Sequence, residues 1–319
     1  LSLVGILFLV ITGVISYNLT NASYAKWSSS VESKNIIKLR VKSGMNATEF
    51  ATKTVGTNGL EQTTDGYRYQ GGNVNNCVTF NDETWRIIGI IPTEDTDGNT
   101  ENRFKIINKD RPRDMALMQW LNCASLSQTG GKCTQNDGSV HYANDWTNST
   151  MNAYLNTTYY NSLTTKSKNM IGTTRYYLGR VDDANRTPSN MLSHEKSGDY
   201  QNEEDKKIAL MYASDYGYGA SKACTTRMSL YQSDDNCKGT NNWLEAFTSK
   251  GEWTITKAGK GNTNAFYVGH YGQVSELNTG NLQTSILPAA RPVLTLSSKV
   301  KISGGTGTWQ SPYQLELSK

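Results

Sequence analysis

The five cysteines are the residues of this chain best suited to chemistry, because thiols can be oxidised in pairs, bind metal ions or act as nucleophiles. Cys123 and Cys133 flank a loop with two consecutive glycines, and Cys224 and Cys237 flank a second polar loop. We predict one local disulfide in each pair, formed in an oxidising compartment. The sequence contains no Cys-x-x-Cys pair, which argues against metal binding by these thiols.

Cys77 is left over from these two pairs. Its neighbours Val78 and Phe80 are typical of a buried strand. We therefore expect a buried, unreacted thiol at this position rather than a catalytic nucleophile.

Oxygen-bearing side chains alternate along Asp95, Asp97, Asn99 and Glu101. Calcium loops also place ligands at alternate positions, so calcium is the cofactor considered for this chain. The complete twelve-residue calcium pattern is missing from this segment. Because Asp97 is followed by glycine, a strong hairpin signal, a metal-free turn explains the same residues.

Few other residues suggest catalysis. His141, His194 and His270 occur in unrelated contexts, and we expect His194-Glu195 to lie in a solvated polar loop. GxSxG, HExxH and P-loop patterns are absent from the sequence. We therefore assign no catalytic residue and expect that the protein is not an enzyme.

The elements that position these groups begin with an apolar segment. Residues 1–16 carry no charge and no proline, whereas the rest of the chain is polar. A membrane-spanning helix needs about 20 apolar residues. The segment therefore suits a signal-peptide core, a membrane anchor or an assembly helix, and the small residues Ser23 and Ala25 would suit a signal peptidase.

The same segment resembles the N-terminal core of type IV pilins, whose peptidase cuts before the apolar run and leaves it attached. Gly5 stands where bacterial pilins carry glutamate. Since the chain begins at the apolar run, we expect the segment to stay on the mature protein. The resemblance implies an assembly helix formed by Leu1, Leu3, Val4, Ile6, Leu7, Phe8, Leu9, Val10, Ile11, Val14 and Ile15.

Aromatic and apolar residues continue at helical spacing to residue 31, so residues 1–34 are predicted as one helix. We interpret residues 35–59 as a linker that contains an alternating, strand-like segment at 37–42. Asn46 and Glu49 have the spacing of a capping box and predict a short helix within it.

Charge is distributed unevenly. Residues 1–54 contain six basic and two acidic residues, which accounts for the whole net charge of +4. A nucleic-acid-binding domain would concentrate basic residues in its body. We therefore expect a basic stem near a membrane surface and no nucleic-acid partner.

Residues 60–319 are predicted to form one large, loop-rich globular domain of the α+β class, with mostly antiparallel strands. Asn, Gly, Thr and Ser interrupt nearly every segment, as in folds of short strands and long loops. Thr147 or Ser149 is expected to cap a helix. Strands are expected at 78–80, 85–91, 103–107, 207–212, 252–256, 265–268 and 291–296.

Several strings in this domain are similar to an uncharacterised family of surface-exposed domains from Gram-positive-type bacteria. They are DGYRYQG at 65–71, NNCVTFNDETWRIIGI at 75–90, NDWTNSTMNAYLNTTYYNSL at 144–163, IALMYASDYGYG at 208–219, NNWL at 241–244, EWTI at 252–255 and RPVLTLSSKVKISGGTGTWQSPYQL at 291–315. The resemblance implies a fold like that of C-type lectins and the formylglycine-generating enzyme.

Two functions of different class follow. The first is a structural subunit of an extracellular, pilus-like filament. Its partners are identical subunits, and the membrane holds it before assembly. The second is an anchored or secreted lectin-like adhesin that binds a glycan or a surface protein. Both hypotheses place the chain at the cell surface, outside the cytoplasm.

Overall fold

The computed structural model describes residues 44–110, 118–127, 130–182, 186–197, 203–245, 251–259, 261–280 and 288–318. The predicted assembly helix, with the whole of residues 1–43, lies outside these ranges. Residues 38–319 group into one unit, and the description below concerns its described part.

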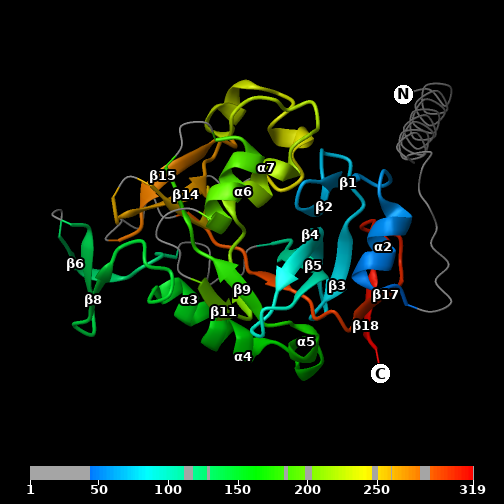
Figure 1. The fold of residues 1–319 in the computed structure, drawn as a ribbon, viewed down its shortest axis with the longest axis horizontal. Coiled ribbons are helices and arrows are strands. Elements are labelled where there is room, and N and C mark those ends of the chain that lie inside the picture. The colour runs from blue at the N-terminus through cyan, green and yellow to red at the C-terminus, as the bar shows by residue number, and fades with distance from the viewer. Residues whose placement is uncertain are drawn as a thin grey trace, which may run out of the picture. The chain divides into compact units, whose positions relative to one another are not determined.

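A seven-stranded antiparallel sheet forms the centre of the domain (Figure 1). The strand order is β1-β2-β4-β5-β16-β12, with β3 also paired to β4. Its strands are β1 (Leu60–Thr63), β2 (Gly66–Tyr69), β3 (Cys77–Phe80), β4 (Glu83–Glu94), β5 (Thr100–Asn108), β12 (Ile208–Ala209) and β16 (Val293–Thr295).

The hairpins β3–β4 and β4–β5 form the middle of this sheet. Asn81 and Asp82 join β3 to β4 with φ of 55° and 58°, which is the left-handed backbone of a two-residue hairpin loop. At Gly89 in β4, an added Cβ would lie 2.2 Å from the carbonyl oxygen of Tyr67, so the close approach of β2 requires glycine. β4 then pairs with β5 along almost its whole length.

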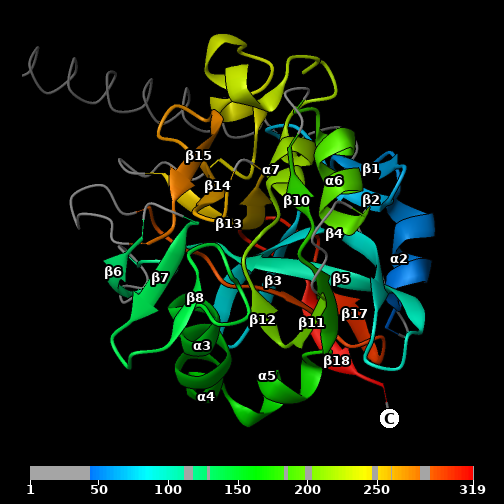
Figure 2. The ribbon, with the colours of Figure 1, turned by 60° about the vertical axis from the view of Figure 1, so that its left-hand side comes forward.

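Smaller sheets surround the central one. A four-stranded sheet has the order β10-β13-β14-β15, a three-stranded sheet β6-β7-β8, and two pairs are β9 with β11 and β17 with β18. Their strands are β6 (Cys123–Leu126), β7 (Lys132–Gln135), β8 (Val140–Tyr142), β9 (Thr174–Tyr177), β10 (Arg180–Val181), β11 (Glu203–Lys206), β13 (Glu252–Ala258), β14 (Asn264–Val268), β15 (Val274–Asn278), β17 (Val300–Gly304) and β18 (Gln314–Leu317). In both ribbon views β6–β8 lie far from α2 (Figure 2).

Helix α2 (Ala47–Thr54) shows how part of the predicted linker joins the domain. Its capping box forms as predicted: Glu49 N donates to Asn46 Oδ1 at 2.9 Å, and Asn46 N donates to Glu49 Oε2 at 3.1 Å. Phe50 and Ala51 are fully buried in the main core. Residues 44–59 of the segment interpreted as a linker therefore belong to the packed domain.

The remaining helices are α3 (Thr150–Tyr154), π-helix η2 (Leu155–Tyr159), α4 (Tyr160–Ser162), α5 (Thr165–Met170), α6 (Pro188–Ser197), α7 (Ala213–Gly219) and the 3-10 helices η3 (Met228–Ser233) and η4 (Gly239–Asn241). Of the two caps predicted for α3, Thr147 or Ser149, the structure uses Ser149. Among the described residues, every helix is too short or too polar to span a membrane.

The fold class is confirmed at the level of a large, mostly antiparallel β domain with short helices. The predicted strands at 78–80, 85–91, 103–107, 252–256 and 265–268 are all present. The strand expected at 207–212 is wrong beyond β12, because the chain turns at Tyr212 into helix α7.

Candidate functional site

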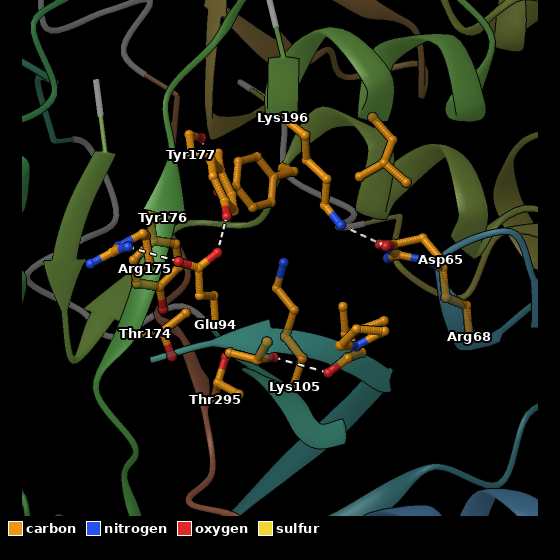
Figure 3. Close-up of a pocket in the computed structure, with 15 residues that line it drawn as sticks. Asp65, Arg68, Glu94, Lys105, Thr174, Arg175, Tyr176, Tyr177, Lys196 and Thr295 are labelled. Carbon is orange, nitrogen blue, oxygen red and sulfur yellow. Dashed lines mark hydrogen bonds and ion pairs between the residues drawn. The ribbon is translucent and has the colours of Figure 1, made fainter. Parts of the chain in front are cut away.

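A cavity open to solvent lies between the central sheet, strand β9 and helix α6 (Figure 3). Four basic and two acidic side chains line it, together with tyrosines, threonines and a few apolar groups. The lining residues are Asp65, Arg68, Ile91, Pro92, Thr93, Glu94, Lys105, Thr174, Arg175, Tyr176, Tyr177, Leu192, Lys196, Tyr212 and Thr295.

The floor of the cavity is built on a buried carboxylate that two cations share. Lys105 Nζ donates to Asp215 Oδ2 at 2.5 Å, and Arg68 Nη1 donates to Asp215 Oδ1 at 2.6 Å. The Asp215 side chain is completely buried, and those of Arg68 and Lys105 are 2% and 7% exposed. Figure 3 shows the Lys105 ammonium pointing into the cavity, between Glu94 on one side and Lys196 on the other.

These contacts shift the pKa values of Asp215 and Lys105. Burial opposes the charge of Asp215, but Lys105 and Arg68 outweigh it and hold the pKa of this carboxyl below its ordinary value. Burial lowers the pKa of Lys105, and Arg68 adds to this effect, while Asp215 opposes both. Asp215 is therefore ionised at neutral pH.

Local sequence explains why Asp215 reaches this place. It lies in the first turn of α7, where the backbone N–H of Tyr212 donates to Asp215 Oδ2 at 2.9 Å. Lys105 lies between Phe104 and Ile106 in the part of β5, residues 103–108, in which every residue is buried. The position of this lysine between Phe104 and the Ile106-Ile107 pair was the signal in the sequence that could have identified it.

Glu195 of α6 binds the first turn of α7 through Ser214. Its carboxylate accepts hydrogen bonds from the Ser214 hydroxyl, from Ser214 N at 3.2 Å and from Thr256 Oγ1 at 2.6 Å. The side chain is 1% exposed, and burial raises the pKa of Glu195 despite these donors. The expectation of a solvated His194-Glu195 loop is therefore wrong: both residues lie on α6.

On the β9 side, the cavity is lined by an arginine–glutamate ion pair and by a tyrosine hydroxyl that donates to the same carboxylate. Arg175 Nη1 donates to Glu94 Oε1 at 2.7 Å, and the Tyr177 hydroxyl donates to Glu94 Oε2. At the more exposed outer edge, Arg175 Nε donates to Asp205 Oδ1 at 3.2 Å.

The opposite wall is a second ion pair. Lys196 Nζ donates to Asp65 Oδ1 at 2.6 Å, and Arg68 Nη2 donates to Asp65 Oδ2 at 3.3 Å. The Lys196 side chain is 40% exposed, which places this pair at the mouth of the cavity.

Three buried polar atoms on lining residues have no hydrogen-bond partner among the described residues. They are Arg68 Nε, Thr174 Oγ1 and Tyr176 Oη. The Thr174 and Thr295 hydroxyls lie near the Tyr176 phenol without a hydrogen bond of normal geometry. Buried polar groups are nearly always satisfied, so these three atoms are available to hydrogen-bond a ligand or water in the cavity.

An aromatic surface completes the cavity. The Lys105 ammonium lies 4.6 Å from the centre of the Tyr212 ring, and the Tyr212 hydroxyl donates to the Tyr177 carbonyl at 3.0 Å. The cavity thus offers charged donors, hydroxyls that can donate or accept, and ring faces. This combination is suited to binding a small polar molecule.

The acidic loop predicted as a calcium candidate is the turn between β4 and β5. Asp95 Oδ1 accepts from the backbone N–H groups of Asp97 and Asn99, both at 2.9 Å, and these bonds lower the pKa of Asp95. Arg103 pairs with Glu101 at 3.1 Å and with Asp95 at 3.7 Å. Among the described residues, the His, Cys, Asp and Glu side chains form no cluster suited to a metal ion.

The cysteines lie apart from the cavity. Cys123–Cys133 joins β6 to β7, and Cys224–Cys237 closes the loop around η3, so both predicted disulfides are present. Two disulfides indicate an oxidising compartment. Cys77 is a free, buried thiol in β3, and burial raises its pKa, as expected of an unreactive cysteine.

The histidines are not brought together. His141 Nδ1 lies 3.8 Å from Asp145 Oδ2, and His194 belongs to α6. The centres of the His270 and Tyr271 rings are 4.7 Å apart. Comparisons with protein-family models, with curated proteins and with solved structures found no match to this chain.

Proposed function

We propose that the protein is an exported surface-binding protein whose globular domain holds a hydroxyl-rich ligand, such as a sugar unit of a glycan, in the cavity beside Lys105. The observation that carries this proposal is the set of unpartnered buried atoms on residues that line the cavity, Arg68 Nε, Thr174 Oγ1 and Tyr176 Oη.

The function proposed is therefore that of the lectin-like adhesin. The family resemblance and the C-type-lectin-like layout remain part of this proposal. Their support is the loop-rich, mostly antiparallel architecture and the two local disulfides, together with the sequence strings that resemble the surface-domain family.

Ligand-observed NMR with the full chain in mild detergent tests this function, using neutral, amino and acidic sugars as probes. Leu192→Trp adds bulk at the cavity, where Leu192 is 8% exposed, and we expect it to abolish saturation transfer to a bound sugar. Leu230→Trp is the matched control, because Leu230 is 42% exposed on η3 and does not line the cavity. Failure of all sugars to bind, or equal binding by both variants, would refute the proposal.

We also propose assembly into a pilus-like filament as a second function. Its support is the apolar segment 1–16, which has no charge. Burying apolar surface contributes about 25 cal/mol per Å², which makes this segment the strongest source of association free energy in the chain. A filament would display many copies of the binding domain.

Deletion of residues 1–16 tests assembly separately from binding. We expect the deleted form to remain monomeric by light scattering, while filaments of the full chain are visible by electron microscopy of sheared surface material. Filaments formed by the deleted form would contradict assembly through the apolar helix.

A further inference from the structure

We infer that the ligand of the cavity is a sugar acid, and that its carboxylate binds at Lys105 and Arg68. This inference rests on the proposed sugar-binding function and specifies the chemical class of the ligand. Three features of the cavity favour such a ligand: the distribution of its charges, the free donors on its floor and the arrangement of its hydroxyls.

The charge balance favours an anion. Asp65 pairs with Lys196 at 2.6 Å and with Arg68 at 3.3 Å, whereas Glu94 and Asp205 both pair with Arg175, at 2.7 and 3.2 Å. On the floor, a single carboxylate, Asp215, serves both Arg68 and Lys105.

Two further carboxylates lie nearby without lining the cavity. Asp205 contacts Arg175 at the exposed edge, and Glu195 faces Ser214 and Thr256 behind α7. Arg68, Lys105 and Lys196 therefore share two carboxylates, Asp65 and Asp215, whereas Arg175 alone faces two, so the excess of positive charge is confined to the floor and the Lys196 side. A ligand carboxylate beside Lys105 and Arg68 would add a negative charge where three cations share two carboxylates, which is favourable where solvent is largely excluded.

The two cations on the floor also carry N–H groups that have no acceptor among the described residues. Among the described residues, Lys105 Nζ has one hydrogen-bond acceptor, Asp215 Oδ2, although an ammonium carries three N–H groups. Arg68 Nε is buried and has no acceptor. An ionised acceptor suits both groups, because charge-assisted hydrogen bonds are about twice as strong as neutral ones.

The rest of the cavity suits the hydroxyl-bearing part of such a molecule. Thr174 Oγ1 and Tyr176 Oη are unpartnered on the β9 side, and each can donate to or accept from a sugar hydroxyl. Figure 3 shows Tyr177 on this side of the cavity, above Glu94, with Lys105 on the floor. A ligand with its carboxylate on the floor and hydroxyls toward β9 would use both sets of groups.

The test compares sugar acids with their own neutral esters on the full chain in detergent. The probes are D-glucuronate, D-galacturonate and N-acetylneuraminate, each beside its methyl ester, and the measurement is the apparent Kd from ligand-observed NMR titration. We expect at least one acid to bind roughly 10-fold or more tightly than its ester, the factor expected for a hydrogen bond to a charged group. Because this comparison uses the unaltered protein, its outcome does not depend on the folding of a variant.

The outcomes separate this inference from the function on which it rests. If acids and esters bind equally well, the cavity binds sugars but the anion inference is wrong. If neutral sugars bind and acids do not, the inference is also wrong. If no sugar binds, the proposed function and the inference both fail.

A matched pair of variants locates the effect. We expect Lys105→Met to remove the preference for the acid over its ester, because the ammonium that would bind the carboxylate is gone. Lys222→Met is the control, because Lys222 is 63% exposed, pairs with Glu61 and lies outside the cavity lining. An unchanged acid preference in Lys105→Met would overturn the assignment of the carboxylate to Lys105.

Discussion

At the level of single residues, the cavity depends on one carboxylate and the cations that it brings together. Asp215 joins Arg68 from β2, Lys105 from β5 and the first turn of α7. A buried ion pair adds little net stability compared with apolar residues, but removing one partner leaves an uncompensated charge. Asp215 therefore constrains three elements at the floor of the site.

Asp215→Asn should reduce the free energy of unfolding by about 3–5 kcal/mol at pH 7, because it leaves two buried cations without their shared carboxylate. Urea denaturation followed by circular dichroism measures the loss. Asp235→Asn is the control, since Asp235 is 94% exposed. A loss below about 1 kcal/mol would contradict the role of Asp215 in holding the floor together.

Stability should depend on pH through Glu195. Burial raises the pKa of Glu195 above its ordinary value of 4.5, so the folded state holds this proton more tightly than the unfolded state. The contribution of Glu195 is therefore largest at low pH and is lost as the pH rises from its ordinary pKa through the folded value. Glu195→Gln should flatten this part of the stability profile. An identical pH dependence in both proteins would exclude Glu195 as its source.

Tyr176→Phe should stabilise the protein by about 1 kcal/mol while weakening sugar binding, because the hydroxyl is buried without a partner until a ligand arrives. Thermal and urea unfolding measure the first effect, and NMR titration measures the second. Tyr231→Phe is the control: its hydroxyl donates to the Gly217 carbonyl at 3.3 Å, so its removal should cost about 1 kcal/mol. Destabilisation by Tyr176→Phe would show that its hydroxyl has a partner in the unliganded protein.

At the level of elements, short-range signals predicted well where the backbone forms its own local hydrogen bonds. The capping box of α2 and the Ser149 cap, one of the two caps predicted for α3, both occur. Helices α6 and α7 were missed, because α6 lacks a continuous apolar stripe and α7 has only seven residues. Their positions depend on the buried contacts of Glu195 and Asp215, which come from distant parts of the chain.

Asn46→Ala tests whether α2 contributes to the domain. We expect a loss of about 1 kcal/mol, the usual cost of removing a helix cap, because Glu49 N would lose its acceptor. Urea denaturation of the full chain measures the change. Lys53→Ala, at an exposed position of the same helix, should change the stability by less than about 0.5 kcal/mol. Equal effects of both substitutions would argue against the cap.

At the level of the whole molecule, the two disulfides stabilise loops outside the central sheet. Cys123–Cys133 lies within the β6–β8 sheet, and Cys224–Cys237 encloses the segment that contains η3. Both close short loops, so each acts locally on a region with few strands of its own.

Replacing both Cys224 and Cys237 by serine should cost about 3 kcal/mol in the entropy model, since their sequence separation is 13 residues. Urea denaturation with and without a reducing agent measures this cost. The reducing agent should further destabilise the variant only through Cys123–Cys133. If the unaltered protein is equally stable under reducing conditions, the disulfides do not stabilise the fold.

The sequence by itself determined the disulfide pairs, the main hairpins, the helix caps and the mostly antiparallel class, because each depends on residues close together in the chain. It did not reveal the cavity. Asp65, Lys105, Tyr176, Lys196 and Asp215 are separated by up to 150 residues and have no local pattern in common. Only the tertiary structure brings them together, because burial makes each charged side chain depend on partners from other elements.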